Sequence, residues 1–202
     1  MTASVVEELS PAGRTLPGPT YNWARELALL SWRPKEVAMH ALRLVALMAA
    51  TISMGLMAGV FALYAHTIMP GLARTDDRTF VGAFQSMDRA IINPWFLGGG
   101  FIGALVLTLV ATAAHLGQDG LPWIAAALVL YLIAFVITIA INVPLNDGLK
   151  AAGDPDRIAD LAAVRRSFNE ARWRSWNLVR VLTSTVAFGL LAWALVLLGR
   201  ET

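Results

Sequence analysis

LPWIAAALVLYLIAFVITIAINVPLND, residues 121–147, is the stretch that decides the fold of this chain. Residues 121–143 are apolar almost throughout, and at about 1.5 Å per residue they can cross the roughly 30 Å of hydrocarbon in a bilayer as a helix. The run then ends in two amides, a proline and a carboxylate, at Asn142, Pro144, Asn146 and Asp147. This stretch therefore predicts a membrane-spanning helix with a polar end.

Three further apolar runs, at 44–65, 96–114 and 181–198, have a comparable length. Hydrophobic residues make up 57% of the sequence and charged residues only 15%, whereas soluble domains are about one quarter charged. The sequence thus predicts an all-α integral membrane four-helix bundle, with both termini on one side. We expect it in a bacterial inner (plasma) membrane.

Outside these spans, we expect an N-terminal extension over 1–43, followed by the four-span domain over 44–202. Residues 21–32 alternate aromatic, aliphatic and charged side chains, which predicts either an interfacial helix that ends at Pro34 or an ordinary solvated helix. Between spans one and two, apolar residues recur at helical spacing over 76–92 and predict a short surface helix. Two Gly-xxx-Gly pairs, Gly55 with Gly59 and Gly99 with Gly103, indicate either close helix packing or chance in a glycine-rich chain.

The composition also excludes several classes of site. The chain has no cysteine, so thiol catalysis and thiolate metal sites are ruled out. Its three histidines, His40, His66 and His115, fall at different levels of the predicted bundle, which disfavours a metal site. The net charge is only +2 and the basic residues form no stripe, so nucleic acid is not an expected partner.

The polar residues gather at one end of the predicted bundle. Spans one and three end there and spans two and four begin there, so four segments rich in polar and aromatic residues share one mouth. Trp173, Asn177 and Arg180 follow i, i+4, i+7 spacing and predict a single stripe entering span four. Asn142 and Asn146 would share a face if the helix continued past Pro144, which disrupts its backbone bonds. Structural capping and interface anchoring are the alternative explanation for all of them.

The same residues resemble a known family. Asn-Val-Pro-Leu-Asn-Asp (142–147), with Trp-x-x-Trp-Asn-x-x-Arg (173–180) about thirty residues later, is similar to the small four-span anthrone oxygenase family. The resemblance extends to Gly-x-x-x-Gly-Val-Phe (55–61), Met69-Pro70, and the segment from Phe84-Gln85-x-Met87 to Asn93-Pro94. It covers residues 44–198.

The resemblance implies oxidation of an anthrone, a fused-ring phenol, to an anthraquinone by dioxygen with no recognised cofactor. Such an enzyme must deprotonate its substrate and stabilise the anion. Arg180, Asn177 and Asn146 are suited to bind an oxyanion. For the base, the candidates are Asp147 and His66, although His66 is outside the family pattern. An Asp147 paired to Arg180 would be a poor base. The expected substrate contacts are Phe61, Phe84, Trp173, Trp176, Asn142, Met69, Gln85 and Asn93.

Two functions of different classes remain open from the sequence. The first is a cofactor-independent membrane oxygenase, whose partners are a hydrophobic aromatic small molecule, dioxygen and the lipid bilayer. The second is a non-catalytic bundle that binds an apolar ligand or a partner protein. The sequence leaves open a homo-oligomer and the orientation in the membrane.

Overall fold

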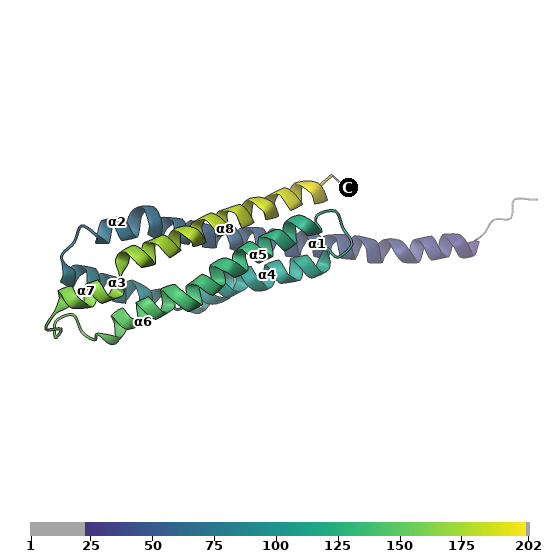
Figure 1. Cartoon of the computed structure of the whole chain (residues 1–202). Coiled ribbons are helices and arrows are strands. Elements are labelled where there is room, and N and C mark those ends of the chain that lie inside the picture. The colour runs from purple at the N-terminus through teal and green to yellow at the C-terminus, as the bar shows by residue number, and fades with distance from the viewer. Residues whose placement is uncertain (1–22, 201–202) are drawn as a thin grey trace, which may run out of the picture. The chain divides into compact units, whose positions relative to one another are not determined.

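The four apolar runs and the polar segments near them form long helices (Figure 1). This computed structural model describes residues 23–200, with side chains from residue 35 onward; the extension before Trp23 lies outside the described residues. Four helical segments are long and apolar enough to cross a membrane: Lys35–Leu72, Trp95–Ala114, Leu121–Ala151 and Leu161–Leu198. The predicted all-helical membrane bundle is confirmed.

Three of these segments contain a π-helical turn, which begins the second segment and lies within the first and third. The first consists of α1 (Trp23–Leu63), η1 (Tyr64–Ile68) and α2 (Met69–Leu72), and the second of η2 (Trp95–Phe101) and α4 (Ile102–Ala114). The third consists of α5 (Leu121–Ile137), η3 (Thr138–Asn142) and α6 (Val143–Ala151). A π-turn inserts one extra residue into a helix and occurs often at functional sites. The fourth helix, α8 (Glu170–Leu198), is continuous.

Neither proline expected to disturb a helix ends one. The predicted end at Pro34 is wrong, because α1 runs through this residue; an interior proline removes one backbone hydrogen bond and bends a helix without having to terminate it. At Pro144 the helix also continues, into α6. There the preceding π-turn, in which the Val143 N–H donates to the Thr138 carbonyl, changes the backbone register just before the proline ring.

The chain divides into two units, Met1–Met39 and His40–Thr202, and the candidate site belongs to the second. Within this unit, α5 packs on α8 and α4 packs on α5, so spans two and three are antiparallel neighbours as predicted. The Arg43 guanidinium donates to the Ala114 carbonyl (Nε to O, 2.9 Å), which places the start of the unit beside the α4–α5 turn. The end of α8 lies at this same end of the bundle, opposite α3, α6 and α7 (Figure 1).

The short helix α3 (Asp77–Ile91) follows the predicted amphipathic pattern. Its N-cap is Asp76, whose carboxylate accepts the N–H of Thr79 at 3.0 Å and the Thr79 hydroxyl at 2.8 Å. The Thr79 N–H holds the pKa of Asp76 below its usual value. On its other face α3 buries Phe80, Val81 and Phe84. The predicted surface helix is therefore confirmed.

The predicted polar connection over 144–177 is largely helical. After α6, a turn region leads to α7 (Leu161–Phe168), and α8 begins at Glu170, well before the expected start at 181. Asn169 joins α7 to α8 in the left-handed conformation (φ 54°), and its side chain accepts the N–H of Arg172 at 3.1 Å. This sharp junction lets α7 pack on both α3 and α6. We call α2, α3, α6, α7 and the first turn of α8 the cap.

The apolar interior has two parts. Inside the bundle, a core formed by α1, η2, α4, α5 and α8 includes Met54, Phe61, Phe101 and Tyr131. Inside the cap, a second cluster consists of Met69, Phe80, Val81, Phe84, Leu149, Phe168 and Trp173. The candidate site lies where these two clusters meet.

The glycine pairs differ in what they do. A Cβ on Gly55 would lie 2.9 Å from the ring of Phe188, so Gly55 does bring span one close to span four, whereas Gly59 has no neighbour within 4 Å of such an atom. In span two, a Cβ on Gly103 would collide with the Gly98 carbonyl of the π-turn, and Gly99 has open space. Close approach is thus required at only one glycine of each pair.

Gly103→Ala is expected to destabilise the bundle. The added methyl group would force apart the π-turn at η2, an overpacking that costs about 1–3 kcal/mol. Gly99→Ala is the matched control, because its methyl group meets nothing. Thermal unfolding in detergent should give a lower midpoint for Gly103→Ala and an unchanged or slightly higher one for Gly99→Ala. Equal midpoints would contradict the close packing of Gly103 against the Gly98 carbonyl in this π-turn.

Candidate functional site

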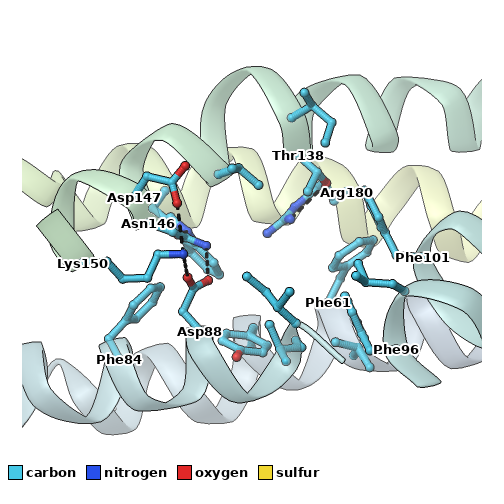
Figure 2. A pocket seen from close by; sticks show the side chains of 18 residues that line it. Phe61, Phe84, Asp88, Phe96, Phe101, Thr138, Asn146, Asp147, Lys150 and Arg180 are labelled. Atoms are coloured by element: carbon cyan, nitrogen blue, oxygen red, sulfur yellow. Dashed lines mark hydrogen bonds and ion pairs between the residues drawn. The ribbon is translucent and has the colours of Figure 1, made fainter. Parts of the chain in front are cut away.

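A pocket of about 230 Å³ lies between the bundle core and the cap (Figure 2). Its volume is just below the range of roughly 300–1,000 Å³ typical of small-molecule sites. The walls are mainly apolar and aromatic, and include Phe61, Phe84, Phe96, Phe101 and Trp173. Polar side chains approach it in two groups, one around Arg180 and one around Asp88. A small, flat, mostly apolar molecule with two polar edges fits this description.

The three π-turns all contribute to the pocket wall. Tyr64 comes from η1, Phe96, Leu97 and Phe101 from η2, and Thr138 and Ile139 from η3. Two neighbouring side chains bond carbonyls of η2: the Ser53 hydroxyl donates to Gly99 at 2.6 Å, and the Tyr131 hydroxyl donates to Phe101 at 2.8 Å. Side-chain hydroxyls thus provide hydrogen bonds to carbonyls of the π-turn, as backbone polar groups within a bilayer require.

Arg180 is a buried cation in the pocket wall. Its guanidinium donates to Thr138 (Nη1 to Oγ1, 3.1 Å) and to Asn177 (Nη2 to Oδ1, 2.8 Å). Its Cζ lies 4.5 Å from the centroid of the Phe61 ring and 5.3 Å from that of Trp173. Among the described residues, no carboxylate lies within 4.0 Å of this guanidinium, and its Nε is buried without a partner. Arg180 can therefore offer its charge to an anion in the pocket.

A second polar group is centred on Asp88 of α3. Its carboxylate accepts a hydrogen bond from Asn146 at 2.7 Å and lies 2.6 Å from the Lys150 ammonium. The same ammonium is 3.0 Å from Asp147, which is 60% exposed, whereas the side chain of Asp88 is only 10% exposed. The carboxylate of Asp88 is thus held at the inner side of the pocket, and Asp147 lies at its exposed rim.

Trp173 joins the two groups. Its indole N–H donates to the Asn146 carbonyl oxygen at 2.8 Å, and its own backbone carbonyl accepts from Asn142 at 3.3 Å. Asn142 and Asn146 therefore share one face of a continuing helix, as their spacing predicts. The indole also meets the Phe84 ring edge to face, with centroids 5.8 Å apart. This contact packs α3 against the first turn of α8 within the cap.

Of the predicted site residues, six line the pocket: Phe61, Phe84, Asn146, Asp147, Trp173 and Arg180. Asn177 and Asn142 lie behind the wall, since Asn177 holds Arg180 and also donates to the Phe61 carbonyl at 3.1 Å. The predicted buried stripe from Trp173 through Asn177 and Arg180 to Ser184 is present in α8.

The other predicted residues are placed away from the pocket. Met69 is buried in the cap, and Gln85 ties α3 to the end of α6 by donating to the carbonyls of Leu149 and Gly153 at 2.9 and 3.0 Å. Asn93 caps span two, accepting the N–H of Phe96 at 2.9 Å, as its position before Pro94 predicts. Trp176 is partly exposed on the outside of α8. His66 is exposed and bonded to Thr67 at 2.6 Å.

The pair between Asp147 and Arg180, which the sequence left open, does not form. Asp147 pairs with Lys150 on its own helix, and Arg180 bonds Thr138 and Asn177. The π-turn at η3 adds one residue between Thr138 and Asp147, which rotates Asp147 by roughly 100° about the helix axis relative to an uninterrupted α-helix. The carboxylate consequently points to the rim.

Sequence reasoning missed Asp88, Lys150, Tyr64 and Thr138 as pocket residues. Asp88 could have been found, because it occupies the apolar face of the predicted helix over 76–92, where a carboxylate requires a partner. The other three follow from the π-turns and the continuation of α6, for which the sequence contains no clear signal. Within the described residues, no group of three or more potential His, Cys, Asp or Glu metal ligands occurs.

The pocket residues of spans two to four fall inside a recognised domain. The model of the anthrone oxygenase family matches residues 92–190. Over this region, the chain belongs to the anthrone oxygenase family. The match includes Asn93-Pro94, the stretch 142–147 and the stripe of α8, and it stops short of the quoted pieces in span one and α3. No curated protein and no solved structure matches the chain.

Membership in the anthrone oxygenase family places Arg180, Asn146, Thr138 and Trp173 within the family domain. Asp88, Tyr64 and Phe61 lie outside the matched residues but complete the same pocket. The residues before position 92 must therefore be considered together with the domain when its chemistry is argued.

Proposed function

We propose that this anthrone oxygenase family member oxidises a hydrophobic fused-ring phenol to a quinone within the membrane, using dioxygen and no cofactor. The observation that carries the proposal is the buried Arg180, a cation without a carboxylate partner in an aromatic pocket. Charged groups within a membrane span are rare and mark functional sites. The helical form of the spans supports a plasma membrane, which in a bacterium is the inner one.

Arg180 would bind the oxygen on which negative charge develops. In an anthrone, the carbonyl oxygen and the reactive methylene carbon lie on opposite sides of the central ring. Loss of a proton from the methylene places charge on the carbonyl oxygen, and the guanidinium can stabilise this charge by a charge-assisted hydrogen bond. Asn177 and Thr138 hold the guanidinium in position.

Asp88 would remove the methylene proton. It lies in the second polar group, separated from Arg180 along the pocket, as an anthrone with its oxygen at Arg180 requires (Figure 2). Lys150 and Asn146 hold the carboxylate in place by an ion pair and a hydrogen bond, so that a base is positioned at the pocket. The weak basicity of such a carboxylate is offset because Arg180 stabilises the anion that forms.

Dioxygen then reacts with the bound anion. The carbanion transfers one electron to dioxygen, and the two radicals combine into a carbon–oxygen bond, giving a hydroperoxide after protonation. Removal of the second proton from the same carbon breaks the oxygen–oxygen bond, forms the new carbonyl and releases hydroxide, which becomes water. One anthrone and one dioxygen thus give one anthraquinone and one water. Phe61 and Trp173 would contact the flat rings.

Emodin anthrone oxidation by the purified protein in detergent tests this proposal. Quinone absorbance and oxygen uptake should rise together, well above empty micelles, and Asn146→Ala should be slower because Asp88 loses its amide partner. Arg200→Ala, at the far end of α8, is the matched control and should equal the wild type. Equal rates for all three proteins and empty micelles would favour a non-catalytic binding protein.

A further inference from the structure

Two residues that line the pocket also lie on the outer surface at the side of the bundle. Ile92 and Ile139 both line the pocket, and these side chains are 58% and 52% exposed on the outer surface. One belongs to the entry of span two and the other to η3 of span three. Below them α4 packs on α5, and above them α3 packs on α6. A side opening at these two residues would therefore lie between two helix contacts.

Tryptophans on the outer surface indicate how deep this opening lies. Trp95 and Trp176 are exposed near the cap, and Trp123 and Trp193 are exposed near the opposite end of the bundle. Tryptophan concentrates at the two bilayer interfaces. Along α8, the positions of Trp176 and Trp193 are about 25 Å apart at 1.5 Å per residue, close to the hydrocarbon thickness. The lipid-facing surface between these bands is apolar, with exposed Val106, Leu132, Ile133 and Val186.

The side opening lies at the interface nearest the cap. Phe101 stacks on Phe135 (centroids 4.7 Å apart), and following the antiparallel spans two and three from this contact brings Trp95 near the level of Ile139. Arg180, which bonds Thr138, lies about one turn deeper than Trp176 on α8. Asp147 and Lys150 lie on the aqueous side, where α6 enters the cap. The pocket thus has an apolar entrance at the lipid and a charged rim at the water.

We propose that Ile92 and Ile139 form a lateral portal through which the substrate enters from the bilayer as a neutral, fused-ring molecule. This inference deepens the proposed function, because it specifies the form and the phase in which the substrate arrives. A neutral phenol dissolves in the outer part of the hydrocarbon and passes apolar side chains at little cost, whereas the rim formed by Asp147 and Lys150 would have to be desolvated. Ionisation then takes place only inside, beside Arg180.

The test uses anthracene, which is flat, fluorescent and has no group to ionise or oxygenate. Its exchange between protein in nanodiscs and unlabelled vesicles can be followed by energy transfer from the tryptophans. In the double variant Ile92→Phe/Ile139→Phe, the entry and exit rates should both fall by about tenfold, with affinity changed much less. Val106→Phe/Ile133→Phe, on the lipid face but away from the pocket, should behave as wild type.

Asp147→Phe tests the other route by covering the aqueous rim, and it should leave exchange unchanged. Slower exchange in Asp147→Phe, with normal exchange in the portal variant, would overturn the proposal, and so would normal exchange in both. Because anthracene is not a substrate, these outcomes are independent of the oxygenase test. A protein without oxygenase activity can still show the portal, and an active oxygenase can still lack it.

Discussion

Arg180→Met is expected to lower the rate of emodin anthrone oxidation by at least about 100-fold. Loss of one preorganised hydrogen-bond donor to a developing oxyanion lowers the rate by about 10²–10³-fold. Arg180 is the cationic donor in the polar group of the pocket that also contains Thr138. Methionine has a similar length and can keep the contacts with Phe61 and Trp173. The initial rate of quinone formation, measured at saturating substrate, provides the comparison.

The same substitution should leave stability unchanged or raise it. A buried charge without a counter-ion carries a desolvation penalty, and replacing buried ionic groups by apolar ones is often neutral or stabilising by about 1–4 kcal/mol. Arg180→Lys serves as the control: it keeps a charge but cannot stack between two rings or reach Thr138 and Asn177 together, so it should recover only part of the rate. A strongly destabilised Arg180→Met with a near-normal rate would show that Arg180 is structural.

Asp88→Asn is expected to lower the rate by about 10²–10⁴, the usual contribution of a positioned base. The amide keeps nearly the same shape but cannot accept the substrate proton. Asp147→Asn is the matched control, because both carboxylates contact the ammonium of Lys150 while only Asp88 is buried. Asp147→Asn should therefore change the rate by less than a few-fold. The two variants are compared under identical conditions by oxygen uptake.

The opposite result, with Asp147→Asn inactive and Asp88→Asn active, would identify Asp147 as the base. It would contradict the proposal that α3 supplies the base through Asp88. Loss of helical content in Asp88→Asn would be seen by circular dichroism. In that case Asp88→Glu, which keeps the charge, separates folding from chemistry: it should restore the fold and some of the rate.

Much of the architecture could be predicted because membrane helices leave a simple signal. Apolar length located the four spans, the i, i+4, i+7 spacing located the buried stripe of α8, and Asn93 with Pro94 located a helix start. The up-and-down order of the spans was enough to predict that the polar segments share one end of the bundle. Six expected site residues line the pocket, and two of these, Phe61 and Phe84, were expected only from the family resemblance.

The electrostatics of the site could not be reached in the same way. Each π-turn shifts the register by one residue, and the turn at η3 moves Asp147 away from Arg180. Asp88 is brought to the pocket by contacts of α3 with α6 and α7, two helices that lie much later in the sequence. A local pattern predicts which face of a helix is buried. It does not predict which charge on another helix will meet that face.

We propose that this protein forms the substrate anion between Asp88 and Arg180. The most direct test of this proposal is anaerobic exchange of the methylene hydrogens of emodin anthrone with deuterated solvent, followed by mass spectrometry, because this measures proton removal without the oxygen step. We predict that the wild type accelerates exchange well above empty micelles, and that Asp88→Asn and Arg180→Met do not. Exchange at the rate of empty micelles with the wild type, while oxygen is still consumed when air is admitted, would contradict the proposal.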